Sequence, residues 1–318
     1  MDKISDFEPI FSIAAVEREV GLSKDVLRVW ERRYGFPAPT RDANGERAYP
    51  ASQVQRLTVI RRLMDRGHRP GKLLPLSAAA LAELAGAPHA EPSEAPPDAA
   101  IGELLGLVRG SDAQGLAQAL QQRLIGEGLQ SFVQDTVAPL TVAVGQAWAD
   151  GQLRIYEEHL FTEVVTRLLR QAVAALPPGR APVVLLTSVP EEPHGLGLMM
   201  VEAVVALQGA RCIALGTQMP LGEIVRAALA HQVDVVALSF SRAFPARQVA
   251  PVLRQLRETL PPRVGLWAGG AGVSRMATTP GVELLHSLEA AAAAALRWRA
   301  ESADTGTPEV GIRGGSTA

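Results

Sequence analysis

The sequence of 318 residues contains one cysteine, few aromatic residues (4%) and no long apolar run. The single cysteine, Cys212, excludes an internal disulfide and a zinc cluster built from cysteines. No apolar run reaches about 18 residues, so we expect no membrane span. The first residues, MDKISDFEPIFS, lack the basic and apolar segments of a signal peptide, so we expect the chain in the cytoplasm.

Lysine is also scarce, and the charged residues are unevenly distributed. All three lysines, Lys3, Lys24 and Lys72, lie near the N-terminus. Residues 1–75 hold 14 Lys and Arg against 10 Asp and Glu, whereas the remaining residues hold 17 against 23. A basic N-terminal region on an acidic body is typical of a protein that binds nucleic acid at one end. An uneven but solvated surface would give the same counts.

The apolar pattern predicts three folded domains. Residues 8–85 contain short, arginine-rich helical segments, and the proline-rich stretch 86–100 is expected to be a linker. Residues 101–178 have apolar residues at three- and four-residue spacing in four segments, which predicts a four-helix bundle. Strands alternate with helices from 181 to 302, and the tail 303–318 is expected to be disordered.

The alternating region predicts a doubly wound α/β domain with a five-stranded parallel sheet, because continuous apolar strands are buried on both faces. The expected strands are 183–189, 211–216, 233–240, 263–269 and 282–286. The expected helices between and after them are 196–209, 220–231, 245–260, 271–277 and 288–300.

The N-terminal domain has the pattern of a winged helix-turn-helix. The segment SIAAVEREVG is expected to form a helix that ends at Gly21, and Ser23 then caps a second helix, KDVLRVWERRYG. Such a second helix lies in the DNA major groove. Its exposed face would carry Lys24, Arg28, Arg32 and Arg33.

The segment FPAPTRDANGERAYP after the second helix predicts a hairpin with its turn near Asn44 and Gly45. This wing would bring Arg41 and Arg47 to phosphates or to the minor groove. Trp30 in the second helix has the alternative, and more common, role of a core residue.

The segment RVWERRYGFPAPTR and the later GERAYP resemble the DNA-binding domain of MerR-family transcription regulators, over about residues 10–80. They are close to the CarA, CarH and LitR subgroup of repressors. We therefore expect an all-α winged helix-turn-helix that binds an operator in double-stranded DNA. The resemblance implies groove contacts from Arg28, Arg32 and Arg33 and DNA-backbone contacts from Arg41, Arg47 and Tyr49.

MerR proteins usually dimerise through a long helix after this domain. Pro70 and the linker would interrupt such a helix here. Self-association to a dimer or tetramer is therefore expected through the C-terminal region, where a bound ligand could control it.

His194 is the residue of the α/β domain that most needs an explanation. It stands in EEPHGLG, where the first strand ends and its helix begins, and ligands of open α/β sheets bind at the carboxyl ends of strands. Ser239 ends the third expected strand, and Gly269 and Gly270 follow the fourth. The histidine alone is compatible with a helix cap, a catalytic base or a ligand for something large.

His194, Ser239 and the glycine pair together resemble the cobalamin-binding domain of cobalamin-dependent methyltransferases, mutases and the regulators named above. The resemblance implies a flavodoxin-like fold in which His194 is the lower ligand of the cobalamin cobalt. Glu192, in place of the commoner aspartate, would orient the imidazole and raise its basicity. The nucleotide tail of cobalamin would pass residues with little or no side chain; the implied set is Gly197, Ser239, Ser241, Gly269 and Gly270.

Trp148 is followed by nine residues and then by Glu158 and His159, the spacing of the regulator subgroup. The resemblance implies that the bundle covers the upper face of cobalamin with these three side chains. Light-sensing members commonly have a histidine directly after the tryptophan, where this chain has Ala149. Light sensing therefore stays open at this point.

We expect a cobalamin-dependent repressor with no catalytic residues. The first hypothesis is a light-responsive protein that binds DNA with adenosylcobalamin in the dark and is released by light, with methylcobalamin as the other candidate cofactor. The second is a light-independent cobalamin sensor. The third, a cobalamin enzyme subunit, would need a substrate-binding barrel of about 250 residues for which the chain has no room.

Overall fold

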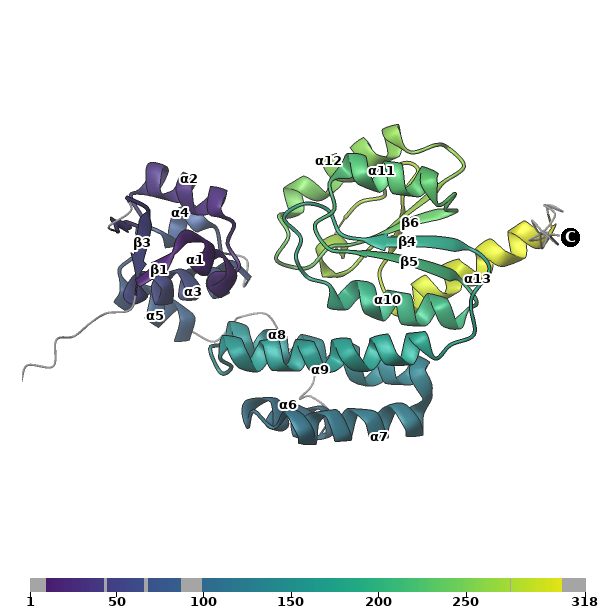
Figure 1. Cartoon of the computed structure of the whole chain (residues 1–318), viewed down its shortest axis with the longest axis horizontal. Coiled ribbons are helices and arrows are strands. Elements are labelled where there is room, and N and C mark those ends of the chain that lie inside the picture. Colours follow the sequence, from purple (N-terminus) through teal and green to yellow (C-terminus); the bar gives the residue numbers. More distant parts are fainter. Residues whose placement is uncertain (1–9, 43–44, 66–67, 87–98, 275, 305–318) are drawn as a thin grey trace, which may run out of the picture. The chain divides into compact units, whose positions relative to one another are not determined.

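The computed structural model describes residues 10–42, 45–65, 68–86, 99–274 and 276–304 (Figure 1). The chain divides into two compact units. The first comprises residues 1–126 and 135–168, and the second comprises residues 127–134 and 169–318. This division does not follow the predicted domain boundaries one for one, and those boundaries stay a prediction.

The helix-turn-helix is present in the first unit as α1 (Ile13–Val20) and α2 (Lys24–Tyr34). The Ser23 hydroxyl accepts a hydrogen bond from the backbone N–H of Val26, which satisfies a donor in the first turn of α2. Gly21 has φ +71° and ends α1 in the left-handed conformation that glycine adopts without steric cost. The two helices therefore begin and end where the sequence predicts.

The wing belongs to a three-stranded antiparallel sheet with the order β1 (Ile10–Ser12), β3 (Arg47–Pro50), β2 (Thr40–Arg41). The expectation of an all-α N-terminal domain is therefore wrong in this detail. Strand β1 was not predicted because its three residues become a strand only by pairing with β3, far along the chain. Asn44, at the predicted hairpin turn, lies outside the described residues.

Three further helices complete the N-terminal part of the first unit: α3 (Ala51–Asp65), α4 (Pro70–Leu73) and α5 (Ala78–Gly86). Their apolar side chains pack with those of α1, α2 and β3 in one core. Trp30 is 6% exposed in this core, which confirms its structural role. Leu57, Ile60 and Leu63 give α3 a fully buried face.

Four α-helices follow between residues 99 and 174, as expected: α6 (Ala99–Arg109), α7 (Ala113–Ser131), α8 (Ala138–Ala149) and α9 (Ile155–Ala174). Regular α-helical geometry is interrupted between the end of α7 and the start of α8. Gly128 has non-helical backbone angles (φ +76°, ψ 161°), and a π-helix, η1 (Phe132–Val137), precedes α8. Within the described residues, no helix is long and apolar enough to span a bilayer.

The second unit contains the predicted parallel sheet, in the order β5 (Arg211–Gly216), β4 (Val183–Thr187), β6 (Val235–Ser239), β7 (Gly265–Gly269), β8 (Glu283–Leu285). Helices α10 (Leu196–Leu207) and α13 (Leu288–Asp304) cover one face, and α11 (Leu221–Ala230) and α12 (Ala246–Thr259) cover the other (Figure 1). The predicted helix 271–277 is a short 3₁₀ turn, η2 (Ala271–Val273). This is the doubly wound arrangement that the sequence predicts.

Two predicted segments fall largely outside the described residues. In the predicted linker 86–100, residue 86 ends α5 and residue 99 begins α6, while 87–98 are not described. In the predicted tail 303–318, α13 continues through Asp304, so the disordered tail cannot begin at 303. The rest of that tail is not described.

Candidate functional site

The loop between β4 and α10 holds His194 at the carboxyl edge of the sheet. The buried Ser188 holds this loop through two hydrogen bonds. Its hydroxyl donates to the backbone oxygen of Glu192 at 2.5 Å and accepts from the N–H of Gln218 at 2.9 Å. Glu191 turns the chain with φ +70°. The backbone that carries His194 is therefore held by bonds to buried groups rather than left to solvent.

The carboxylate of Glu192 connects the hydrogen bonds around His194, and its side chain is almost fully buried, at 1% exposed. Its Oε1 accepts from Nδ1 of His194 at 2.6 Å and from the backbone N–H of His194 at 3.1 Å. Its Oε2 accepts from the backbone N–H of Ser241 at 2.7 Å. The carboxylate thus joins the ends of β4 and β6, which are neighbours in the sheet.

The pKa of Glu192 is the balance of two effects. Burial raises it, but the hydrogen bond and charge of His194 and the backbone donors of Ser241 and His194 outweigh burial, so the pKa lies below its ordinary value. Glu192 is accordingly ionised at neutral pH. An ionised Glu192 keeps the proton of the imidazole on Nδ1 and leaves Nε2 as the nitrogen that can coordinate a metal.

The His194 side chain is 49% exposed, so the part of the ring away from Glu192 is open to solvent. Neutral imidazole suits cobalt, and an oriented ring loses little freedom when it binds. A metal that is coordinated by a single protein imidazole needs its other ligands from a prosthetic group. The residues present therefore fit a metal held in a macrocycle, as cobalamin holds cobalt.

The glycines of the predicted site lie where parts of the protein approach one another closely. A Cβ on Gly197 would lie 2.7 Å from the hydroxyl of Ser239, and a Cβ on Gly269 would lie 3.1 Å from a backbone oxygen. A Cβ on Gly270, which has φ +90°, would lie 2.4 Å from the backbone oxygen of Phe240. These glycines allow parts of the protein to approach one another closely, so the space for a tail cannot be inferred from their missing side chains.

The bundle residues of the predicted site lie in the first unit. Glu158 and His159 are both accessible on α9, with 3.7 Å between Nε2 of His159 and Oε2 of Glu158. Trp148 is near the end of α8, and the next residue, Ala149, is 9% exposed. His194 belongs to the second unit, so a shared site between these residues and His194 stays a prediction.

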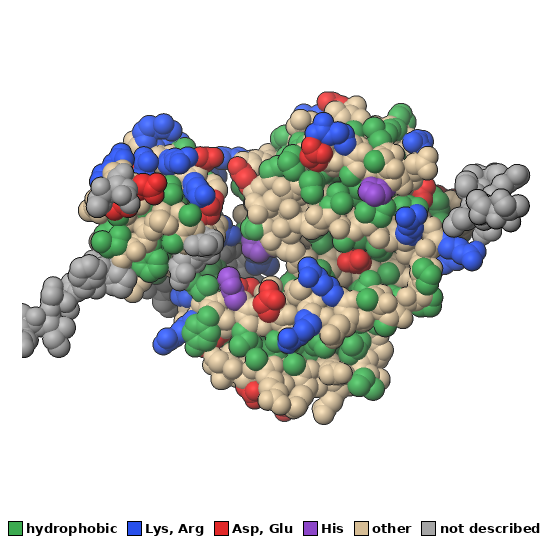
Figure 2. Space-filling view, in the orientation of Figure 1, with side chains coloured by type: hydrophobic (Ala, Val, Ile, Leu, Met, Phe, Trp, Pro, Cys, Tyr) green, Lys and Arg blue, Asp and Glu red, His purple; other side chains and the backbone are tan. Residues whose placement is uncertain are grey.

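The cations of α2 form an exposed basic face. Arg28, Arg32 and Arg33 are exposed, and Figure 2 shows Lys and Arg side chains gathered over this helix. Arg28 is 3.2 Å from Asp25, and Lys24 is 3.3 Å from Glu17, so both cations are partly neutralised. The face remains suited to a polyanion.

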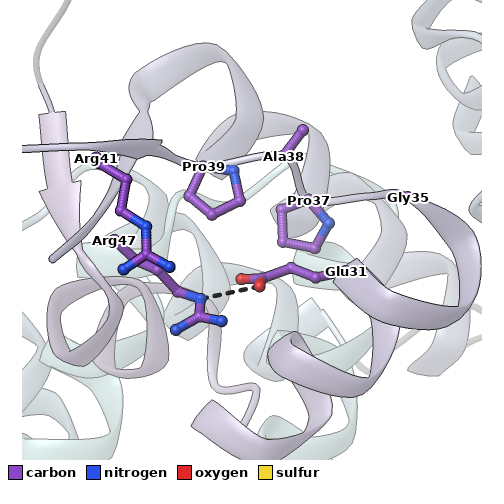
Figure 3. Close-up of a pocket in the computed structure, with 7 residues that line it drawn as sticks. All are labelled: Glu31, Gly35, Pro37, Ala38, Pro39, Arg41 and Arg47. Carbon is purple, nitrogen blue, oxygen red and sulfur yellow. Dashed lines mark hydrogen bonds and ion pairs between the residues drawn. The ribbon is translucent and has the colours of Figure 1, made fainter. Parts of the chain in front are cut away.

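A hollow of about 270 Å³ lies between the end of α2 and the wing (Figure 3). It is lined by Glu31, Gly35, Pro37, Ala38, Pro39, Arg41 and Arg47. Arg41 is exposed at its edge and donates to the backbone oxygen of Gly45. The Arg41 guanidinium is therefore more open to an anion than that of Arg47, which already has a carboxylate partner.

That partner is Glu31, which the sequence did not single out. Its two oxygens accept from Nε of Arg47 at 2.9 Å and from the hydroxyl of Tyr49 at 2.5 Å. Tyr49, expected at the DNA backbone, is instead fully buried, and burial and the bond to Glu31 raise its pKa. Tyr49 therefore packs beneath the wing as a core residue. The sequence could not reveal its burial, because a strand of four residues is too short to show an apolar pattern.

Comparisons with known proteins match the whole pattern. Residues 11–73 match the family described as MerR HTH family regulatory protein, and residues 101–172 and 182–294 each match a family described as B12 binding domain. A curated relative is the HTH-type transcriptional repressor CarH of Myxococcus xanthus, 31% identical over 268 residues, which are 83% of this chain and 90% of that protein. The HTH-type transcriptional repressor CarA of the same organism is 27% identical over 248 residues, 76% of this chain and 80% of that protein.

Among solved structures, the chain is similar to the Methanosarcina barkeri monomethylamine corrinoid protein. The TM-score is 0.46 at 15% identity, covering 61% of this chain and 96% of that one. The relatives that span most of the chain are transcriptional repressors, and this sets the enzyme-subunit hypothesis aside.

Proposed function

Because the chain belongs to the family of cobalamin-binding MerR-type transcriptional repressors that includes CarH, we propose that it is a light-responsive repressor with adenosylcobalamin as its sensory cofactor. In the dark it binds an operator in double-stranded DNA as a dimer or tetramer. Light releases it from the operator.

The observation that carries the cofactor proposal is the bond from Nδ1 of His194 to the buried, ionised Glu192. This bond fixes the tautomer and the direction of the ring before any ligand arrives. The accessible Nε2 of His194 would then hold the cobalt. Bound adenosylcobalamin would supply a cobalt–carbon bond that visible light cleaves.

In this proposal the bundle senses the upper face of the cofactor through Trp148, Glu158 and His159. The exposure of Glu158 and His159 on α9 supports a role at a ligand surface, because neither side chain is needed in a core. Ser239, Ser241 and the glycines Gly197, Gly269 and Gly270 frame the cofactor's tail at the carboxyl edge of the sheet. Trp148 would hold a cofactor group, and loss of that group would free the bundle to move.

DNA binding is proposed through Lys24, Arg28, Arg32 and Arg33 of α2 in the major groove and through Arg41 and Arg47 of the wing at phosphates. Two helix-turn-helix domains on one assembly bind two half-sites together. Linkage of this kind raises affinity by about 10²–10⁴ over a single site, so light-driven dissociation of the assembly would release the operator.

Ala149 favours a second candidate, a light-independent repressor that responds to cobalamin as an effector. Alanine has no atom that can coordinate cobalt, and this position is buried in the bundle. The exposed His159 is the alternative ligand that a light-sensing mechanism would need to recruit.

The test is the visible spectrum of the protein reconstituted with adenosylcobalamin, before and after green light, with His194→Ala as the matched variant. Retention of the cofactor in the dark, followed by a stable new spectrum after light, is the expected result. Release of the cofactor in light without a stable adduct would favour the light-independent sensor. Equal retention by His194→Ala and the wild type would refute the ligand role of His194.

A further inference from the structure

One side chain of the DNA-binding part reaches the turn between α8 and α9. Arg62 of α3 donates from Nη2 to the backbone oxygen of Leu153 at 3.0 Å. Its guanidinium carbon lies 5.4 Å from the centre of the Trp148 ring, within the range of a cation–π contact. All of these residues belong to the first compact unit.

The backbone of the turn is shaped to receive this arginine. Gly151 has φ +72°, and a Cβ placed there would lie 3.3 Å from Nη1 of Arg62. Leu153, whose oxygen accepts the bond, is 1% exposed, so the acceptor is not a freely moving loop tip. The guanidinium is therefore held between a ring and a fixed carbonyl.

Helix α3 also forms part of the DNA-binding domain's core. Leu57, Ile60 and Leu63 are fully buried in that core, with 0% of each residue exposed to solvent. The same helix contacts α1 and β3, which adjoin the recognition helix and the wing. A displacement of Arg62 is therefore transmitted to α3, a rigid helix of the DNA-binding domain.

We infer that Arg62 is a positioning residue that couples Trp148 to the DNA-binding domain. It holds the indole and the α8–α9 turn against α3, so that a displacement of Trp148 changes the position or mobility of α3. This inference rests on the proposed function, since it is there that Trp148 senses the cofactor. It adds a route from that tryptophan to the DNA-binding domain within one chain, beside any change in assembly.

The test compares Arg62→Met with Arg62→Lys in the full-length protein. Methionine keeps much of the length of arginine but has neither charge nor donors, whereas lysine keeps the charge and a donor but not the planar group that stacks on the ring. Arg109→Met is the matched control, because Arg109 bonds Gln152 in the same turn from α6 and does not come from α3. Thermal unfolding shows that each variant is folded.

The first measurement is the ratio of DNA dissociation constants without and with adenosylcobalamin in the dark. If the wild-type ratio lies in the usual range for coupled sites, about 5- to 150-fold, Arg62→Met should bring it close to one while cofactor retention stays the same. Arg62→Lys should give an intermediate ratio, and Arg109→Met should keep the wild-type ratio. A wild-type ratio in Arg62→Met would overturn the inference.

The second measurement is amide hydrogen exchange of the protein without cofactor, over α3 and residues 148–155. Arg62→Met should accelerate exchange in both segments together, and Arg109→Met only in the turn. Unchanged exchange in α3 would overturn the positioning role. If the wild type shows no response to cobalamin, the proposed function fails, whereas faster exchange in Arg62→Met still upholds the mechanical link.

Discussion

Replacing Glu192 by glutamine tests whether this carboxylate orients His194, the proposed cobalt ligand. The carboxylate accepts three hydrogen bonds, from Nδ1 and N–H of His194 on one oxygen and from the N–H of Ser241 on the other. An amide offers one oxygen and one NH₂ group. Whichever way it is oriented, the NH₂ faces a donor that previously had an acceptor.

The magnitude follows from the burial of this side chain, which is 1% exposed. Leaving one buried donor without an acceptor costs about 1–3 kcal/mol of unfolding free energy. Loss of the partner that orients a metal-bound histidine lowers metal affinity by about 10- to 100-fold. We therefore expect Glu192→Gln to be less stable and to bind cobalamin at least about tenfold more weakly.

The assay is a visible-absorbance titration of cobalamin into the variant, together with urea unfolding. Glu191→Gln is the control, because it makes the same chemical change at the neighbouring, exposed residue. The stability difference also has a pH signature. The folded pKa of Glu192 lies below 4.5, so its contribution is complete above pH 4.5 and disappears as the pH falls through the lower folded value. Cobalamin affinity equal to that of the wild type would refute the orienting role.

Two further substitutions and one labelling experiment test other parts of the structure. Glu31→Gln should lower the unfolding free energy by about 1–3 kcal/mol and weaken DNA binding in a gel-shift assay, because the wing loses its charged acceptor. Unaltered DNA affinity would show that the bonds from Glu31 to the wing are not needed for DNA binding. Gly270→Ala should lower the unfolding free energy measured in urea by about 2–6 kcal/mol, because Gly270 has φ +90° and its added Cβ would lie close to the backbone of Phe240. The control Gly222→Ala should be nearly neutral, because its added Cβ would meet nothing within 4 Å. Burial, with the charge of Glu202, raises the pKa of Cys212 to about 12, so iodoacetamide at pH 8.5 should modify it slowly in the native protein, and rapid labelling seen by mass spectrometry would contradict this.

The elements of the α/β sheet could be predicted from the sequence because each one carries its own signal. Continuous apolar runs mark β4 and β6, and amphipathic spacing marks α12. By contrast, β1 is a strand only because it pairs with β3, and such pairing has no local signature. The π-helix after Gly128 also lies inside a segment whose apolar spacing is helical.

The candidate site shows the same limit. His194 and Glu192 could be found because topology and spacing place them at the end of a strand. Glu31 and Arg62 could not, since a charged residue on an amphipathic helix is usually solvated, and only the fold shows which partner it meets. The close approaches at the glycines could not be predicted either, because a missing side chain in the sequence does not say whether a ligand or the protein's own backbone takes the space.

The bond from Glu192 to Ser241 joins residues that are 49 positions apart in the chain. A ribosome must therefore release β6 before the ring of His194 can be fully oriented, and a partly synthesised chain offers no complete site. A ligand that recognises only the finished sheet stabilises finished molecules alone, by about 2.7 kcal/mol at a hundred times its dissociation constant. The supply of cofactor then influences how many copies survive cellular quality control, in addition to what each copy does.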